Sequence, residues 1–144
     1  TVRDIMTRDV VSIRAMATVR EVLDLMFSHK LRYLPVVDEE ECLVGEVGIL
    51  DLIAAGIPEY AQRVGNLNFL SELEPLEKLL RNEATIAVES VMKSPAKAVS
   101  PDTTVLEVSL EMATTKKRHY AVVEKGRLVG VVSSMDILSK VLRA

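Results

Sequence analysis

The sequence predicts a mixed α/β fold that consists of two copies of one β-α-β-β-α unit joined by a helical spacer. The main observation is an internal repeat, because a shift of 86 residues places Ile5-Met6 on Val91-Met92. A shift of 85 then places Leu43-Val44-Gly45 on Leu128-Val129-Gly130, with the turn before these residues one residue shorter in copy two. The second observation is that both copies contain the same order of strand and helix patterns.

Each copy is expected to begin with a short strand and a capped helix. The strands are Val10–Ile13 and Ala96–Val99. Thr18 and Thr104 are each followed three residues later by Glu, the capping-box pattern in which the Thr hydroxyl accepts a backbone N–H of the first helical turn. Apolar residues then recur at helical spacing, at Val19, Val22, Leu23, Met26 and Phe27 in copy one and at Val105, Val108 and Met112 in copy two.

Two buried strands and a second helix complete each copy. The first of these strands is rich in β-branched and apolar residues, and a polar turn separates it from the next. The expected strands are Tyr33–Val37 and Leu43–Val47 in copy one and Tyr120–Val123 and Leu128–Val132 in copy two. The closing helices are Leu50–Ala55 and Met135–Leu142.

The chain is therefore divided into a first repeat (residues 1–56), a spacer (57–87) and a second repeat (88–144). Pro58 suits the first turn of a helix, and Gly65 and Pro75 should divide the spacer into two or three short helices. Apolar residues recur about once per helical turn in this segment. They must pack either on the repeats or against a second chain, and the sequence leaves both open.

Composition excludes several classes of protein. Of 144 residues, 49% are hydrophobic, which is enough for a core, and the net charge of −3 disfavours nucleic acid as a partner. Cys42 is the only cysteine, so no intrachain disulfide can form, and no apolar run is long enough to cross a membrane. We expect a cytoplasmic location. The chain begins at Thr1 rather than Met, which leaves open that it is a piece of a longer protein.

The order of these motifs, present twice, resembles a pair of cystathionine β-synthase (CBS) domains, also called a Bateman module. The residues that carry the resemblance are LVGVVSSMDIL at 128–138, IMTRDVVSI at 5–13 with VMKSPAKAV at 91–99, and RYLPVV at 32–37 with RHYAVV at 118–123. The resemblance implies two repeats packed about a pseudo-twofold axis, with two clefts between them. It also implies an adenosine-derived ligand in these clefts, such as AMP, ADP, ATP or S-adenosylmethionine.

The resemblance further implies roles for individual residues in one cleft, here called the Asp136 cleft. Asp136 would bind the ribose hydroxyls and Ser133 the ribose or phosphate, with Thr7 and Val11 of copy one on the opposite side. A carboxylate can accept both hydroxyl protons of a ribose, and a helix N-terminus favours phosphate. The alternative is structural, because Ser133-x-x-Asp136 is itself a capping-box pattern.

The corresponding Asp51 cleft departs from the family pattern. Gly48 replaces the hydroxyl residue, and the strand of copy two would contribute Lys93 and Lys97. A lysine can reach a phosphate but is a poorer wall for adenine than Val11. We therefore expect a ligand to enter the Asp136 cleft first.

Cations cluster where each first helix ends. Arg118 and His119 in copy two, and Arg32 in copy one, occupy positions that reach ligand phosphates in related modules. The alternative is a solvated cation that the helix dipole favours at a C-terminus.

These features favour a regulatory module that is not an enzyme, since His29, His119 and Cys42 show no metal-ligand spacing and no catalytic motif is present. Such a module would pass ligand occupancy to a fused or separate effector domain. The alternative is a ligand-free scaffold for dimerisation. We also expect a homodimer that buries helix faces around Leu25, Met26, Leu110 and Met112.

Overall fold

The computed structural model describes residues 1–55, 81 and 85–142, and it confirms the mixed α/β fold. Two three-stranded sheets have the orders β1-β2-β3 and β4-β5-β6. In each sheet the middle strand is parallel to the first and antiparallel to the third. The strands are β1 (Ile13–Arg14), β2 (Tyr33–Val37), β3 (Leu43–Gly48), β4 (Ala98–Val99), β5 (His119–Glu124) and β6 (Arg127–Ser133). The four inner strands are present as predicted. The two outer strands are shorter than predicted, since β1 shares only Ile13 with the expected Val10–Ile13, and β4 covers only the last two residues of the expected Ala96–Val99.

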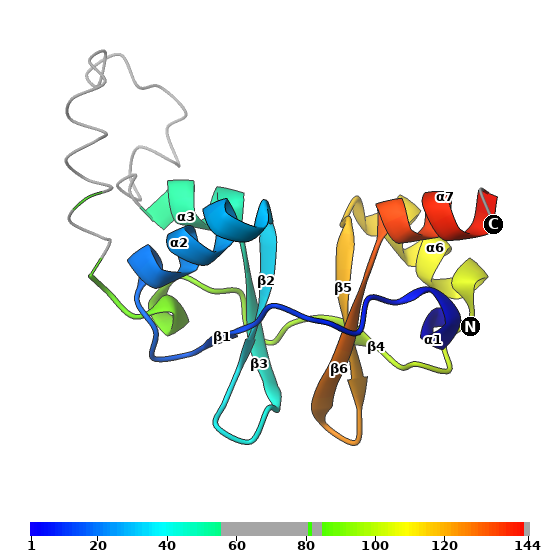
Figure 1. The fold of residues 1–144 in the computed structure, drawn as a ribbon, viewed down its shortest axis with the longest axis horizontal. Coiled ribbons are helices and arrows are strands. Elements are labelled where there is room, and N and C mark those ends of the chain that lie inside the picture. Colours follow the sequence, from blue (N-terminus) through cyan, green and yellow to red (C-terminus); the bar gives the residue numbers. More distant parts are fainter. Residues whose placement is uncertain (56–80, 82–84, 143–144) are drawn as a thin grey trace, which may run out of the picture.

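Helices cover the outer side of each sheet, so that the two sheets lie next to each other in the middle of the molecule (Figure 1). The helices of the first repeat are α2 (Val19–His29) and α3 (Ile49–Ala55), and those of the second are α6 (Val105–Thr115) and α7 (Ser134–Leu142). Two short elements were not predicted, the helix α1 (Val2–Ile5) and the 3₁₀ turn η2 (Val88–Ser90). The helices predicted within the spacer lie outside the described residues.

Both predicted capping boxes are confirmed. The Thr18 hydroxyl accepts the backbone N–H of Glu21 at 3.2 Å, and the Thr104 hydroxyl accepts that of Glu107 at 3.1 Å. Each glutamate in turn accepts the backbone N–H of its threonine at 3.4 Å. The same local signals therefore begin α2 and α6 at equivalent positions.

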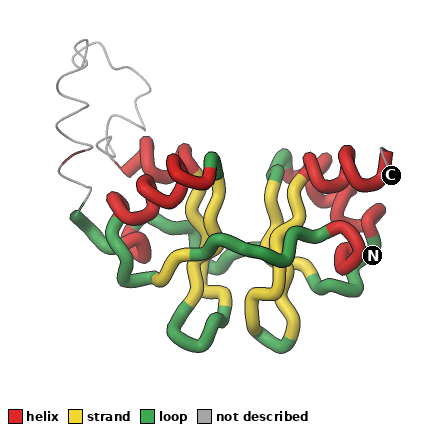
Figure 2. The backbone as a smooth tube through the Cα atoms, viewed as in Figure 1, coloured by secondary structure: helices red, strands yellow, loops and turns green. Residues whose placement is uncertain are grey.

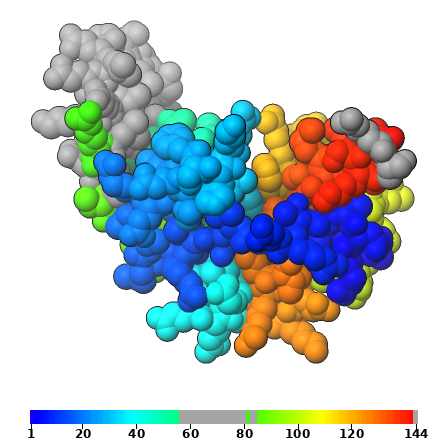
Figure 3. Space-filling model, viewed as in Figure 1, coloured from blue at the N-terminus to red at the C-terminus, as the bar shows by residue number. Residues whose placement is uncertain are grey.

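The two repeats exchange their N-terminal segments. Val2, Ile5 and Met6 are buried in the core of the second repeat, although β1, a few residues later, joins the sheet of the first. Val88 is fully buried in the core of the first repeat, although β4 joins the sheet of the second. Figure 2 shows the loop after α1 crossing from one sheet to the other, and Figure 3 shows the N-terminal segment (dark blue) lying across the second repeat.

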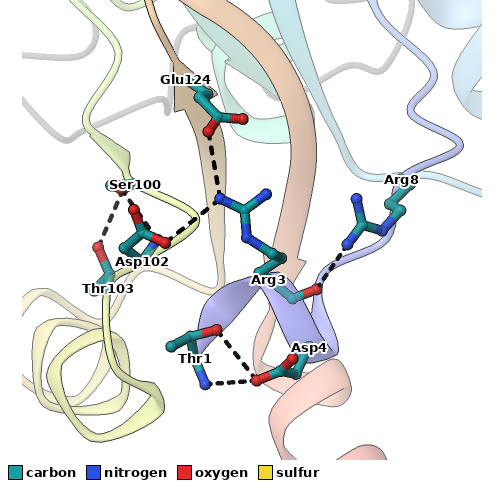
Figure 4. Close-up of polar contacts among 8 residues, drawn as sticks. All are labelled: Thr1, Arg3, Asp4, Arg8, Ser100, Asp102, Thr103 and Glu124. Carbon is teal, nitrogen blue, oxygen red and sulfur yellow. Dashed lines mark hydrogen bonds and ion pairs between the residues drawn. The ribbon is translucent and has the colours of Figure 1, made fainter.

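Polar contacts also hold α1 on the second repeat. The backbone N–H of Val2 donates to the carbonyl of Thr103 at 2.8 Å. The Arg3 guanidinium lies between Asp102 and Glu124, at 3.4 and 3.3 Å (Figure 4). The repeats of the sequence are therefore not separate packing units.

Glycines at equivalent positions allow each crossing segment to approach the opposite sheet. A Cβ atom on Gly130 would lie 2.8 Å from the Met6 sulfur and 3.0 Å from the Thr7 carbonyl oxygen. A Cβ atom on Gly45 would lie 2.5 Å from the Met92 sulfur. The close approach lets Thr7 bridge to Val131 of β6, and this contact brings Thr7 to the Asp136 cleft.

Two of the four residues expected on an exposed helix face are buried. The prediction is wrong for Met26 and Met112, which are 1% and 9% exposed, because both point from their helices into the cores. Leu110 is exposed as expected, and Leu25 is half-buried. The largest exposed apolar side chains on α3 and α7 are Leu50, Met135, Leu138 and Leu142.

Candidate functional site

A cleft of about 190 Å³ lies between the repeats at the N-terminus of α7. It contains four of the residues expected in the Asp136 cleft, namely Asp136, Ser133, Thr7 and Val11. Thr7 comes from the crossing segment of the first repeat, and its hydroxyl donates to Asp136 Oδ1 at 3.4 Å. Both repeats therefore contribute polar groups to one small space.

Asp136 also caps α7. Its Oδ2 atom accepts the backbone N–H of Ser133 at 2.9 Å, and the Ser133 hydroxyl accepts the backbone N–H of Asp136 at 3.0 Å. The capping alternative is therefore present in the structure. It uses Oδ2, whereas Oδ1 faces Thr7 and lies 3.3 Å from the Lys140 ammonium. One carboxylate oxygen thus holds the helix start, and the other is directed toward polar groups at the cleft.

The other walls of the Asp136 cleft are mainly apolar. Val11, Leu31 and Val131 line it together with Pro35. Such a surface suits the face of a flat aromatic ring, and the polar groups at one end would fix the orientation of that ring. A pocket with apolar walls and a few convergent polar groups is the usual form of a small-molecule site.

Tyr33 and His119 occupy equivalent positions of the two repeats and stack on each other. Their ring centroids are 5.0 Å apart, and the ring planes differ by 5°. Both residues line both clefts, so this stack separates the two. Burial lowers the pKa of the His119 imidazole below its ordinary value, because the charged form loses hydration. His119 is therefore a neutral neighbour of the ligand space at neutral pH.

The second cleft, which contains Asp51, is larger, at about 890 Å³, and more of the residues that line it are charged. Asp51 caps α3 by accepting the backbone N–H of Gly48 at 2.7 Å. Its other oxygen lies 3.7 Å from the ammonium of Lys93, the residue equivalent to Thr7. This cleft also extends to Ser133 and Met135, so the two clefts share a border at the start of α7.

A charged cluster occupies the Asp51 cleft. The Lys117 ammonium contacts Glu46 at 2.6 Å, and the Tyr33 hydroxyl donates to Glu46 at 3.0 Å. Burial, together with the charge of Glu46, raises the pKa of the Tyr33 phenol far above its ordinary value, so that the phenol stays protonated and keeps donating. Lys117 also lies 4.7 Å from the centroid of the Tyr120 ring.

The structure brings most of the predicted site residues together, with two exceptions. Lys97, expected in the Asp51 cleft, lines neither the Asp51 cleft nor the Asp136 cleft, and its ammonium contacts both carboxylate oxygens of Glu111 at 2.8 Å. Arg118 lines the larger cleft and not the smaller one, whereas Arg32 lines both.

Sequence reasoning did not identify Leu31 or Glu46 as cleft residues, and it named Lys117 only as one of the cations that cluster where the first helix of copy two ends. A signal for them exists in the internal repeat. Leu31 aligns with Lys117, and Glu46 aligns with Val131, so an apolar residue opposes a charged one at both pairs. A comparison of the two copies, position by position, could therefore have predicted that these residues make the clefts different.

The described residues contain no group of three or more His, Cys, Asp or Glu side chains that could hold a metal ion. None of the described helices is long and apolar enough to span a membrane.

Comparison with known proteins identifies the class. The CBS domain family matches residues 2–57 and 88–143, and the chain belongs to this family. It is 32% identical over 136 residues to a zinc metalloprotease of Methanocaldococcus jannaschii, covering 94% of this chain and 30% of the protease. It is 29% identical over 153 residues to the chloroplastic CBS domain-containing protein CBSX1 of Arabidopsis thaliana, covering 99% of this chain and 64% of CBSX1.

Among solved structures, the chain is similar to CBSX2 in complex with AMP. The TM-score is 0.77 at 25% identity, and the match covers 99% of this chain and 96% of CBSX2. The chain spans less than two thirds of the length of the curated relatives described above.

Proposed function

We propose that this chain is a non-enzymatic regulatory module that binds an adenosine-derived ligand in the Asp136 cleft and passes its occupancy to a partner domain or protein. The ligand class comprises AMP, ADP, ATP and S-adenosylmethionine. The observation that carries the proposal is the contact between Thr7 and Asp136 at 3.4 Å, next to the apolar walls of this cleft. The similarity to CBSX2, which was solved with AMP, supports the same ligand class.

Each part of such a ligand has a matching surface. The adenine ring would pack against Val11, Leu31 and Val131, which are apolar. The ribose hydroxyls would donate to Asp136, where they would compete with the Thr7 hydroxyl and the Lys140 ammonium for Oδ1. Phosphates would lie at the border between the clefts, which Ser133 and His119 line together with Arg32.

A ligand in this cleft would couple the two repeats. Thr7 and Val11 come from the first repeat, whereas Ser133 and Asp136 come from the second. A ligand that touches both sides stabilises the inter-repeat geometry in which all contacts form. The chain would exchange between this geometry and a second one in which the contacts are incomplete. The ligand can shift an attached effector only by the difference between its affinities for these two inter-repeat geometries.

The deciding experiment is isothermal titration calorimetry with AMP, ADP, ATP and S-adenosylmethionine, performed on the wild type and on Asp136→Ala. Loss of a charge-assisted hydrogen bond costs about 1.5–3 kcal/mol, so the affinity should fall about ten- to a hundredfold. Asp51→Ala is the matched control, because Asp51 caps α3 as Asp136 caps α7. This control should leave the affinity unchanged. The reverse ranking, or no binding of any of these ligands at millimolar concentration, would contradict the proposal.

A second candidate function is self-association as a scaffold, and exposed apolar side chains favour it. Leu50 on α3 and Met135 on α7 are 74% and 66% exposed, and Leu138 and Leu142 extend the apolar face of α7. Burial of such faces stabilises dimers. We therefore propose a homodimer, which light scattering at tens of micromolar should detect. A monomer mass under these conditions would contradict it, and Leu138→Glu should shift a dimer toward monomer.

A further inference from the structure

The two clefts also differ at two pairs of equivalent wall positions. In the Asp136 cleft these positions hold Leu31 and Val131, and both side chains are apolar. In the Asp51 cleft the same positions hold Lys117 and Glu46. The equivalence of Glu46 and Val131 follows from the sheet registers, since Pro35 pairs with Glu46 in one sheet and Ala121 pairs with Val131 in the other. Leu31 and Lys117 are equivalent because they lie two residues before β2 and β5.

The Glu46 carboxylate is held by the Lys117 ammonium and by the Tyr33 hydroxyl. The Lys117 ammonium contacts both carboxylate oxygens of Glu46 at 2.6 Å, and the Tyr33 hydroxyl adds a third contact at 3.0 Å. The side chains of Glu46 and Lys117 are only 10% and 23% exposed. The pair joins β3 of the first repeat to the segment between α6 and β5 of the second, and so it bridges the cleft.

We propose that Glu46 and Lys117 close the Asp51 cleft to an adenine ring, so that the chain binds one adenosine-derived ligand rather than two. An entering ring would have to separate a largely buried ion pair and leave its charges without partners, which is strongly unfavourable. It would also pack against charged groups where the Asp136 cleft offers apolar ones. This inference rests on the proposed function, because it assumes that the Asp136 cleft accepts such a ligand.

The test replaces the pair with the residues of the other cleft, in the double variant Glu46→Val/Lys117→Leu. Removal of both charges avoids an unpaired buried charge, and exchange of a buried pair for apolar residues of similar volume is commonly tolerated. If this variant does not fold, Glu46→Gln/Lys117→Met keeps the length of both side chains and removes both charges. AMP is the probe, and native mass spectrometry and calorimetry count the molecules bound per chain.

We expect one AMP per wild-type chain and two per double-variant chain. The second AMP should bind about tenfold more weakly than the first, because Gly48 offers no hydroxyl where Ser133 has one. Addition of Asp136→Ala to the double variant should weaken the first site and leave the second unchanged. The matched control is Lys97→Leu/Glu111→Val, which removes another Lys–Glu pair that lies outside the Asp51 cleft, and it should still bind one AMP.

The outcomes separate this inference from the proposed function. Two AMP molecules on the wild-type chain would overturn the inference and leave the proposed function intact. One AMP on both the wild type and the folded double variant would also overturn it, because the ion pair would then not be the barrier. If AMP binds neither protein, the same counts are made with ADP, ATP and S-adenosylmethionine, and no binding of any of the four would overturn the proposed function itself.

Discussion

At the Asp136 cleft, a carboxylate and two hydroxyl groups from different repeats meet at one end of a small apolar space. At the Asp51 cleft, the same backbone frame holds a glycine, an exposed lysine and a largely buried ion pair. Both aspartates cap a helix in the same way, through the backbone N–H three residues before them. The comparison shows that helix caps and sheet registers place the two sites equivalently, whereas a few wall side chains make the two clefts chemically different. Under the function proposed above, only the Asp136 cleft would suit a nucleoside.

The largest expected effect comes from removal of one partner of the ion pair in the Asp51 cleft. In Lys117→Ala, the Glu46 carboxylate, whose side chain is 10% exposed, loses its ammonium partner and retains the hydrogen bond from the Tyr33 hydroxyl. Separation of a buried pair in this way costs about 3–5 kcal/mol. We therefore expect the free energy of unfolding in urea to fall by about 3 kcal/mol.

The control for this prediction is Lys97→Ala. Lys97 also pairs with a glutamate, but the side chains of the pair are 57% and 38% exposed, so the loss should be below about 1 kcal/mol. Equal losses for the two variants would show that burial does not distinguish the two pairs.

The next largest effect is expected at Gly130 and Gly45, the equivalent glycines that the two crossing segments approach. Gly130→Ala places a Cβ atom against Met6 and the Thr7 carbonyl, and should destabilise the fold by about 1–3 kcal/mol. Because Thr7 must move, the affinity for AMP should fall as well. Gly45→Ala creates the equivalent clash with Met92 and should destabilise the fold without a loss of AMP affinity. Urea unfolding and calorimetry measure the two effects, and an equal loss of affinity in both variants would remove the distinction between the clefts.

A smaller effect is expected at the helix caps, where the repeats do not differ. Thr18→Ala and Thr104→Ala each remove a hydroxyl that accepts a backbone N–H at the start of α2 or α6. Each variant should lose about 1 kcal/mol of stability and keep its affinity for AMP. Thermal unfolding and calorimetry test this. A loss of binding without a loss of stability would assign these threonines to the ligand instead.

The smallest effect concerns pH. Burial lowers the pKa of His119, and Asp136 opposes this shift. The pKa of His119 in the folded state therefore lies below its value of about 6.5 in the unfolded chain. The contribution of His119 to stability is fully present above about pH 6.5 and is lost as the pH falls through the folded-state pKa. Without ligand, urea unfolding at about pH 7.5 and about pH 5.5 should show a smaller decrease for His119→Gln than for the wild type. Identical decreases in the two proteins would show that His119 does not contribute to the pH dependence of stability.

Local sequence signals accounted for much of the fold. The Thr-x-x-Glu boxes mark the starts of α2 and α6, because a cap depends only on residues three positions apart. The β-branched runs locate the inner strands for a similar reason. The segment exchange was not predictable in this way, because burial of Val2 and Val88 depends on the opposite repeat rather than on their neighbours in sequence.

The candidate site was predictable where the family motif covers it. Thr7 was expected across from Asp136, and the two side chains lie 3.4 Å apart. Lys97 was assigned by position in its strand, but a long exposed side chain turns toward the nearest available carboxylate, here that of Glu111. The contact between Glu46 and Lys117 spans 71 residues of sequence, and no local pattern encodes it.

The exchange of N-terminal segments has a consequence for synthesis on the ribosome. When the residues of the first repeat have left the exit tunnel, its core still lacks Val88 and the neighbouring Ile86, Val91 and Met92. Meanwhile Val2, Ile5 and Met6 have no partner, because the core that receives them has not yet been translated. Neither half can complete its packing before the other has been made. We therefore expect the nascent chain to complete its packing only after both repeats have been made, rather than one repeat after the other.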